Sequence, residues 1–473
     1  MSQNTLTARG AMNERPAAAG SEKYTSGPAY HRYLIGLVLA NIAISSVWGM
    51  CGILIPNQIQ ILETAHWFTG ADAGVNIQQL SLLQQHVAAG AATAEQARLL
   101  AILAHFNAAK ASSLAIVTAV GVAVTMLAQP LIGVVSDRTR NRLGRRAPLI
   151  LFGALAGGAV FALLPFAPGV AVVGLLYTIG QLLINVAQSP VAATLADRVQ
   201  VQHLGTASSL GGFGGFFGII GGAVFAGAMF ASLGLSIYAI IAALVAATCT
   251  LFVFVAPDRS SRDLAVAPFH WKEFLLGFTI ALRSADFRWV WIARVLLTFG
   301  MSCSLTLGIY MMQSYIHPAL SAAEATSLAP KLYLAAAPLS MLSTVFAGRL
   351  SDRLRRRKPF VIASSLILAA SFVVPIVSPT LPALFIQAAI SGLAYGIFIP
   401  IDQALFIDVL PDTKSAGRDL GVAQLGFNLG QAIGPIAAGI VVSTTGGYLG
   451  VWVTGIVAVS LAAVAILPVR GAR

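Results

Sequence analysis

Two ionisable residues of opposite sign interrupt long apolar stretches of the chain. Arg294 lies about two helical turns into the stretch 288–311, and Asp402 lies near the end of the stretch 380–407. A charge at the centre of a bilayer costs roughly 2.5–3.5 kcal/mol on insertion scales, so such residues are rare and are usually paired. We expect Arg294 and Asp402 to face each other, so that protonation of the carboxylate would free the arginine for a ligand. A silent buried pair, or an Arg294 that reaches the membrane surface, is the alternative.

Neutral amides form a second group of candidate ligand contacts. Asn41 occupies the place in the first half of the chain that Arg294 occupies in the second. Gln181, Asn185 and Gln188 are spaced four and three apart, so they share one helical face. Amides suit hydroxyl-rich ligands and suit hydrogen bonds between helices equally well. The aromatic residues that could stack on a ligand ring are Trp48, Trp291 and Tyr395.

Other chemistry finds little support. The three cysteines, Cys51, Cys249 and Cys303, lie inside apolar stretches and are read as buried small hydrophobes. None of the seven histidines has metal-ligand spacing, and the sequence contains no P-loop and no nucleophile–base set. We therefore expect no metal, no cofactor, no ATP-driven pump and no enzyme.

The composition places these residues in a membrane protein. Hydrophobic residues make up 57% of the 473 and charged residues only 10%, whereas a soluble domain carries roughly 25% charge. Apolar runs of roughly 20 residues, the length that crosses a bilayer as a helix, recur along the chain. We predict an all-α membrane protein with twelve transmembrane helices over 33–56, 112–136, 148–167, 170–194, 207–232, 235–256, 288–311, 331–351, 359–377, 380–407, 420–442 and 447–468.

The basic residues indicate the orientation. The net charge of +12 lies mainly in short loops, as topology determinants do, which argues against a nucleic-acid partner. With both termini in the cytoplasm, only Arg98, Lys110 and Lys331 among the counted basic residues fall on the outer side. We expect an integral protein of the lipid bilayer, in a bacterial inner (plasma) membrane, with both termini cytoplasmic.

The two halves of the chain repeat each other. Gly133-Val-Val-Ser-Asp-Arg138 returns as Gly348-Arg-Leu-Ser-Asp-Arg353, 215 residues later. Two ladders of helix-packing glycines, 212 residues apart, are Gly214, Gly218 and Gly222 and then Gly426, Gly430 and Gly434. Glycine at every fourth residue lets helix backbones approach closely, as a fixed packing seam or as a sliding interface. The repeats predict two pseudo-symmetric six-helix bundles around a central cavity.

The expected organisation follows from this repeat. We assign 1–32 to a cytoplasmic N-terminal tail rather than a signal peptide, and 33–256 to the N-terminal six-helix bundle. This bundle holds an outer insert at 63–110, in which Thr93-Ala-Glu-Gln96 predicts a capping box that opens a helix through Phe106. A cytoplasmic linker at 257–286, with an interfacial helix over 271–282, precedes the C-terminal bundle at 287–473.

The loop after the second span carries the most specific motif. It reads Gly133-x-x-x-Asp137-Arg138-x-x-x-Arg142-x-Gly144-Arg145-Arg146 and resembles the signature loop of the major facilitator superfamily. With Ala147-Pro148 after it, the loop looks like that of the sucrose and glycoside–pentoside–hexuronide cation symporters. The resemblance implies secondary active transport by alternating access, with a sugar or glycoside as the small-molecule solute and H⁺ or Na⁺ as the coupling cation.

Charges at the cytoplasmic ends are expected to gate this movement. A carboxylate at Asp137 could meet the positive end of a neighbouring helix, and Arg138 could pair with Asp197. Such pairs could hold a cytoplasmic gate shut and break as the halves rock. The predicted gating residues are Asp137, Arg138, Arg142, Arg145 and Asp197, with Asp352, Arg353 and Asp408 as their counterparts.

Two other functions stay open at this point. An exporter of amphipathic compounds would show a cavity rich in aromatic and methionine side chains with few polar groups. A receptor that kept a transporter fold would lack gate movement on binding.

Overall fold

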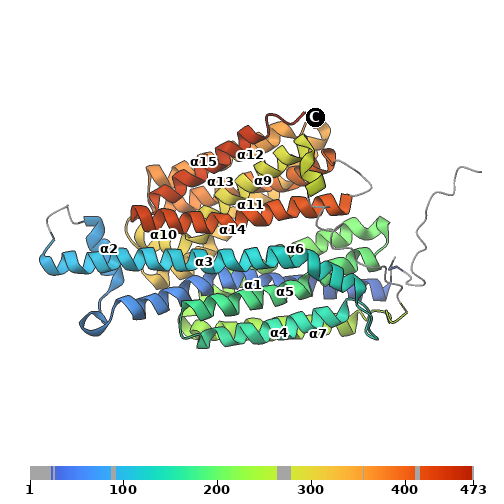
Figure 1. The fold of residues 1–473 in the computed structure, drawn as a ribbon, viewed down its shortest axis with the longest axis horizontal. Coiled ribbons are helices and arrows are strands. Elements are labelled where there is room, and N and C mark those ends of the chain that lie inside the picture. Colours follow the sequence, from blue (N-terminus) through green and yellow to red (C-terminus); the bar gives the residue numbers. More distant parts are fainter. Residues whose placement is uncertain are drawn as a thin grey trace, which may run out of the picture.

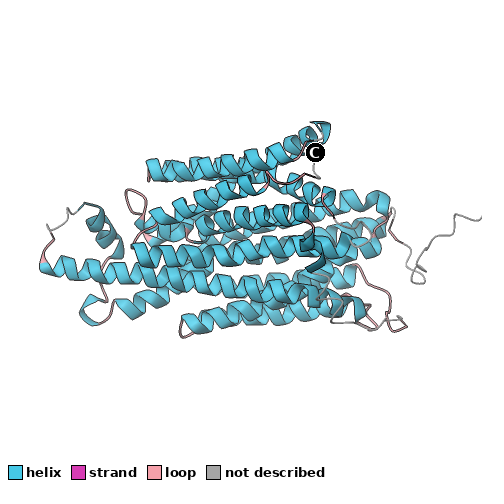
Figure 2. Ribbon diagram, turned by 45° about the horizontal axis from the view of Figure 1, so that its top comes forward, coloured by secondary structure: helices cyan, strands magenta, loops and turns pink. Residues whose placement is uncertain are grey.

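The protein is an assembly of long helices that run side by side (Figures 1 and 2). The computed structural model describes residues 23–24, 27–86, 92–263, 279–354, 356–410 and 416–470. Within these ranges the regular structure is helical, apart from one isolated bridge between Tyr24 and Val199. The predicted all-α membrane fold is confirmed.

Each half contributes six membrane-length crossings. The first half contains α1 (Pro28–Trp67), α3 (Ala94–Arg138), α4 (Ala147–Leu163), α5 (Val170–Arg198), α6 (Val201–Leu233) and α7 (Ile237–Val255). The second contains α9 (Ala285–Thr306), α11 (Ala322–Leu354), α12 (Lys358–Val377), α13 (Leu381–Asp408), α14 (Ala416–Thr445) and α15 (Leu449–Ala465). Among the described residues, ten apolar helical segments are long enough to span a bilayer, one of which joins α6 to α7, and α15 is a shorter apolar helix. These make the twelve crossings that the sequence predicts.

Short elements connect these helices. They are η1 (Gly70–Asp72), α2 (Ile77–His86), η2 (Leu164–Phe166), η3 (Gly234–Ser236) and α10 (Gly308–Ser314). The element α2 lies at one end of the molecule, which we call the cap end, and the C-terminus lies at the other, which we call the terminus end (Figure 1).

The helix predicted inside the outer insert is longer than expected. Thr93 and Gln96 form the expected capping box, but the helix continues past Phe106 to Arg138. No glycine or proline interrupts the chain between residues 94 and 120, so nothing ends the helix there. At 45 residues it is about 67 Å long, roughly twice the hydrocarbon thickness, and it therefore projects beyond the membrane at the cap end.

The seventh crossing is broken. Helix α9 ends at Thr306, before the expected residue 311, and α10 continues from Gly308. Most of the predicted interfacial helix at 271–282 lies outside the described residues.

The glycine ladders pack helices together inside each half. A Cβ on Gly218 would lie 2.5 Å from the Ile42 carbonyl oxygen of α1, and a Cβ on Gly430 would lie 2.6 Å from the Val295 oxygen of α9. The other ladder members, Gly214, Gly222, Gly426 and Gly434, meet the same two helices. The ladders are thus seams between α1 and α6 and between α9 and α14, rather than a sliding surface between the halves.

Two other helix pairs join the halves. Helix α14 packs along α3, where a Cβ on Gly439 would lie 2.7 Å from Ala115 Cβ. Helix α11 packs on α6, where a Cβ on Gly227 would meet the Pro330 ring at 2.5 Å. Both contacts leave no room for larger side chains, so the halves approach most closely along these lines.

Candidate functional site

Arg294 and Asp402 form an ion pair inside the second half. Arg294 Nε donates to Asp402 Oδ2 at 2.7 Å, and Nη2 lies 2.5 Å from the same oxygen. The two side chains are 1% and 5% exposed. The guanidinium carbon lies 4.0 Å from the centre of the Phe406 ring, which adds a cation–π contact. Only the Nε contact has hydrogen-bond geometry, so Nη2 remains a buried donor without a hydrogen bond in the described structure.

The position of the pair follows from its two helices. Arg294 is nine residues after the first residue of α9, and Asp402 is six residues before the last residue of α13. Both helices have these ends at the terminus end of the molecule, so the two residues reach a similar depth. One turn further into the protein, Thr298 Oγ1 donates to the Arg294 carbonyl oxygen at 2.8 Å.

A central cavity of about 380 Å³ begins at this level. Thr298 and Tyr395 line it near the ion pair, and other polar groups come from Tyr333, Ser340, Gln387, Ser391 and Gln431. Most of the wall is apolar and includes Met301, Met311, Met312, Phe216, Phe372, Phe427 and Trp452. Gln387 Nε2 donates to Ser391 at 2.8 Å, and Ser391 bonds Ser371 at 2.9 Å. The cavity therefore offers a few hydrogen-bonding groups in an apolar, methionine- and aromatic-rich wall.

The predicted amides lie outside this cavity lining. Asn41 donates to the Leu37 carbonyl oxygen at 2.9 Å and faces the glycine ladder of α6. Gln181 packs against Gly121 of α3, and its Oε1 is buried without a hydrogen bond in the described structure. Gln188 is half-buried on the same helix. These side chains serve helix contacts in this conformation.

Asn185 belongs to a polar chain that crosses between the halves. Gln129 Nε2 of α3 donates to Asn185 Oδ1 at 3.3 Å, and Asn428 Nδ2 of α14 donates to Gln129 Oε1 at 3.2 Å. Sequence reasoning missed Gln129 and Asn428. Each is an amide in an apolar stretch of a spanning helix, which is the signal that could have identified them.

Of the three aromatic residues predicted to contact a ligand, one lines the cavity and two pack against neighbouring helices. Tyr395 lines the cavity, whereas Trp291 Nε1 donates to the Val422 carbonyl oxygen at 3.0 Å and packs on α14. Trp48 is half-buried against the core of the first half.

The charges at the terminus end of the first half gather around Arg146. Its guanidinium lies 2.6 Å from Asp137 and 2.9 Å from Asp197, and its Nη1 donates to Ser136 at 2.7 Å. Arg145 also pairs with Asp197. Asp197 thus pairs with Arg145 and Arg146, two arginines that the sequence prediction had not assigned to it. The reason is geometric, since Arg146 is the N-cap of α4 and enters between α3 and α5.

The second half repeats this arrangement with Arg357. This residue is the N-cap of α12, lies 2.7 Å from Asp408 and 4.0 Å from Asp352, and donates to the Ala404 carbonyl oxygen. The expected partner, Arg353, is exposed and forms no ion pair with the described residues. Arg142 is likewise exposed. Both clusters tie helices within one half.

The cap end, in contrast, is closed by hydrogen bonds between the halves. Thr326 Oγ1 of α11 donates to Asn57 Oδ1 of α1 at 2.8 Å, and Tyr310 donates to the Pro56 carbonyl oxygen at 2.8 Å. Gln85 of α2 donates to the Ile316 carbonyl oxygen at 2.9 Å. These contacts hold the two halves together at the cap end in this conformation.

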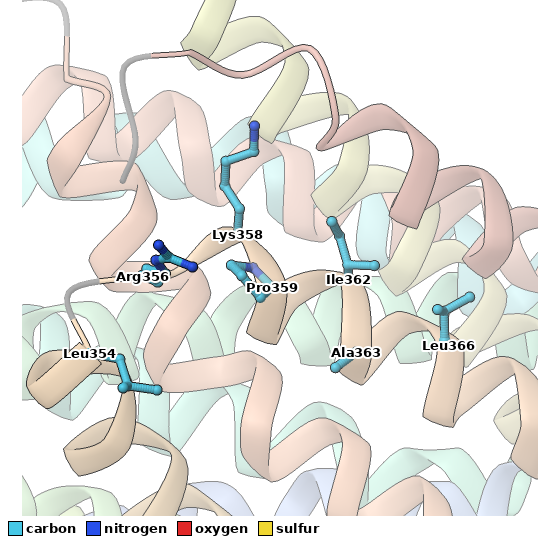
Figure 3. Close-up of a pocket in the computed structure, with 7 residues that line it drawn as sticks. All are labelled: Leu354, Arg356, Lys358, Pro359, Ile362, Ala363 and Leu366. Carbon is cyan, nitrogen blue, oxygen red and sulfur yellow. The ribbon is translucent and has the colours of Figure 1, made fainter.

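A surface hollow of about 850 Å³ lies at the terminus end, where α11 ends and α12 begins (Figure 3). Arg356, Lys358, Ile362 and Leu366 are among its lining residues. Lys358 Nζ donates to the carbonyl oxygens of Leu467 and Val469. None of the predicted site residues lines this hollow.

Two bundles of six membrane-length helices, closed at one end around a central cavity with a buried ion pair nearby, define a polytopic transporter. The sequence matches the profile of the Major Facilitator Superfamily over residues 37–337 and 306–472, and the chain belongs to this family. The comparison with curated proteins gave no match.

Solved structures share the fold. A bacterial homologue of the human lysosomal transporter Spinster, inward-facing and unoccupied, aligns with a TM-score of 0.61 at 13% identity over 94% of this chain and 96% of its own. The same protein in its occupied state gives a TM-score of 0.63 at 13% identity, over 94% and 96% of the two chains. The nucleoside transporter NupG (D323A mutant) gives 0.66 at 13% identity, over 92% and 99%.

Proposed function

We propose that this transporter moves a small amphipathic solute by alternating access, driven by a coupling cation, with Arg294 and Asp402 as the coupling pair. The observation that supports the proposal is the burial of this pair next to the central cavity. It is almost fully buried, and one helical turn separates it from the wall of the cavity. Charges this deep in a membrane protein are retained mainly for substrate or ion pathways.

Proton binding gives the pair two states. With Asp402 ionised, its carboxylate holds the guanidinium at 2.5–2.7 Å. With Asp402 protonated, the attraction between the charges is lost and Arg294 is free to bind an acceptor on the solute or to reorient. Arg294 and Asp402 belong to different helices of one bundle, so this change alters how α9 and α13 pack.

Alternation between the two membrane sides requires rocking of one half against the other. The basic loops at the terminus end favour a cytoplasmic location for that end, so closure at the cap end corresponds to an inward-facing state. Opening the cap end would break the Thr326–Asn57 and Tyr310–Pro56 contacts. The clusters at Arg146 and Arg357 would then serve gating by keeping the terminus end of each half rigid while it moves.

The cavity wall limits the solute class. The amide and hydroxyl groups of Gln387, Ser391 and Gln431 suit a hydroxyl-rich portion, while the methionine and aromatic side chains suit an apolar portion. A glycoside with an apolar aglycone satisfies both, and a bare sugar satisfies only the first. The same wall favours a second candidate, which is export of amphipathic compounds.

Uptake by proteoliposomes tests these assignments. The panel contains glucose, sucrose and p-nitrophenyl glucosides, with and without an inward proton or sodium gradient, and with the gradient reversed to detect export. We expect gradient-driven movement of the aryl glycosides, which D402N abolishes. The control E95Q removes an exposed carboxylate of the cap and should keep wild-type rates.

Each outcome decides a part of the proposal. Movement that D402N leaves intact would remove Asp402 from the coupling path. Movement driven only by the reversed gradient would select export. If folded protein moves none of the glycosides in either direction, the glycoside assignment is wrong.

A further inference from the structure

A second buried cation lies at the cap end, far from the coupling pair. Lys110 of α3 is 1% exposed. Its Nζ lies 4.7 Å from the centre of the Phe106 ring and 4.9 Å from that of Tyr310 in α10. It therefore sits where the first half meets the second.

Lys110 has no carboxylate partner among the described residues. The nearby Glu63 accepts from Ser113 at 2.8 Å and from Trp67 at 3.2 Å instead. Glu324 accepts from the backbone and the hydroxyl of Ser321. A buried ammonium with only aromatic neighbours carries a desolvation cost that these contacts offset only in part.

A cavity of about 300 Å³ lies in front of this ammonium. Its lining comes from α1, the insert, α3, α10 and the start of α11, and includes Gln60, Ser81, Lys110, Gln313 and Ser321. Gln60 and Gln313 are 7% and 5% exposed, and each has an amide atom without a hydrogen bond in the described structure. Buried polar atoms are normally satisfied, so this many unpaired groups around one cavity indicate a missing ligand.

The site lies at a depth that aqueous solutes reach. Lys110 is 28 residues from Arg138, the last residue of α3 at the terminus end. This separation corresponds to about 42 Å of helix and exceeds the hydrocarbon thickness of about 30 Å. Lys110 therefore lies at the outer membrane surface, next to the insert residues that line the cavity.

We infer that this cavity binds a small organic monocarboxylate. The ammonium of Lys110 supplies one positive charge and an amide donor is available on Gln313, which together match one carboxylate group. The remaining amide and hydroxyl groups suit a hydroxyl-bearing body. A dianion such as phosphate would leave one negative charge uncompensated in a buried place. Because the cavity is lined by both halves, its ligand would favour the conformation closed at the cap end.

Thermal unfolding of the purified full-length protein tests this inference. Sodium acetate, lactate and gluconate are the probes, each compared with sodium chloride at equal concentration, and tryptophan fluorescence reports unfolding. We expect at least one carboxylate to raise the Tm of the wild type. In K110M the concentration for a half-maximal shift should rise at least about 30-fold. K331M removes an exposed lysine of α11 and should behave as the wild type.

The starting Tm of K110M separates a ligand site from a structural lysine. Removal of an unpaired buried charge should leave this Tm unchanged or raise it, whereas loss of a stabilising lysine would lower it. If K110M does not fold, Q313L provides the second test, with a weaker carboxylate shift expected. Absence of a carboxylate-specific shift in the wild type, or an equal shift in K110M, would overturn the inference. Binding is measured without transport, so a failure here is distinct from a failure of Asp402 in the uptake experiment.

Discussion

Arg146 and Arg357 occupy equivalent places in the two halves. Each is the N-cap of a helix whose second residue is proline, and each lies within 4.0 Å of two aspartates. Each basic run contains several arginines, and the sequence alone does not show which of them pairs with the aspartates. The helix start distinguishes them, because the N-cap residue is the one that enters between neighbouring helices.

Loss of these arginines should destabilise the protein in a fixed order. R146M removes a side chain that is only 7% exposed and leaves Asp197 and Ser136 without this donor, so we expect a loss of about 1–3 kcal/mol. R357M should cost less, because Arg357 is 23% exposed. R142M removes an exposed side chain and serves as the control. Thermal unfolding in detergent measures the order, and an R142M loss equal to that of R146M would contradict it.

The buried pair can be tested for stability separately from transport. D402N leaves the Arg294 charge buried and unpaired, so we expect a marked fall in Tm. R294M should fall less, because the carboxylate left behind can be neutralised by a proton. The double variant R294M/D402L removes both charges and should recover much of the lost stability while transport stays abolished. A double variant that still transports solute would show that the pair is only structural.

At the level of single residues, the sequence predicted those contacts that follow from the depth of a residue along its spanning helix. Arg294 and Asp402 could be paired because their distances from their helix ends place them at similar depths. The neighbours of Asn41 and Gln181 could not be predicted, because they depend on which helix faces which. That information lies in the packing of α1 on α6 and of α5 on α3.

The packing of helix elements depends on glycine at specific positions. G218A would place a Cβ 2.5 Å from the Ile42 carbonyl oxygen and 2.9 Å from Ser45 Cβ, so α1 and α6 must separate. We expect a loss of about 1–3 kcal/mol. Nothing lies within 4 Å of the corresponding Cβ at Gly221, so G221A should be neutral or stabilise by up to about 1 kcal/mol. Equal losses of stability for G218A and G221A in thermal unfolding would show that Gly218 is not needed for the close packing of α1 on α6.

The cap contains an ion cluster whose dependence on pH can be predicted. Arg98 lies 2.6 Å from Asp72 and 2.6 Å from Glu95, and its hydrogen bonds lower the pKa of Asp72 below its usual value. A carboxyl whose pKa is lowered by folding stabilises above its unfolded pKa, about 3.9, and loses this contribution as pH falls through the folded pKa. The contact of η1 with α3 that this cluster makes should therefore be equally strong between pH 5 and 8, and it should weaken only below about pH 4.

Limited proteolysis of the insert measures how firmly η1 is held against α3. D72N removes the titrating carboxyl and should give at pH 7 the cleavage rate that the wild type shows only in acid. A wild-type cleavage rate that changes between pH 6 and 7 would contradict the assignment. The effect is expected to be small, since Arg98 is half exposed.

The start of a helix could be predicted where hydrogen bonds between neighbouring residues define it. Thr93 and Gln96 define a helix start through their own hydrogen bonds, and the structure has that start. The length of α3 was not predicted, because a helix ending at Phe106 and a separate span over 112–136 were expected where the structure has one helix. A helix continues through polar residues when no proline or glycine stops it and when its polar groups find partners in a cap.

At the scale of the whole molecule, the two ends of the protein are held differently. Hydrogen bonds between the halves join the cap end through Asn57, Thr326 and Tyr310, whereas the arginine clusters of the terminus end act within each half. The Asn428–Gln129 hydrogen bond also joins the halves, away from the cap end. The contacts at the cap end can break without loss of either bundle. This arrangement is what rocking of two rigid halves requires.

The closing contact should control how often the cap end opens. Removal of the Asn57–Thr326 hydrogen bond in N57A costs the closed state about 1 kcal/mol, which corresponds to an approximately fivefold rise in the open population. S304C, in the wall of the central cavity, reports this population in a background where Cys51, Cys249 and Cys303 are alanine. A membrane-impermeant maleimide added to intact cells should label S304C about five times faster when N57A is present. S443C, exposed on α14 at the cap end, controls for reagent access. If N57A leaves the S304C rate unchanged while S443C reacts, this hydrogen bond does not hold the cap end closed. The barrier then lies in the other contacts between the halves, which are the Tyr310–Pro56 and Gln85–Ile316 hydrogen bonds and the α6–α11 packing around Gly227 and Pro330.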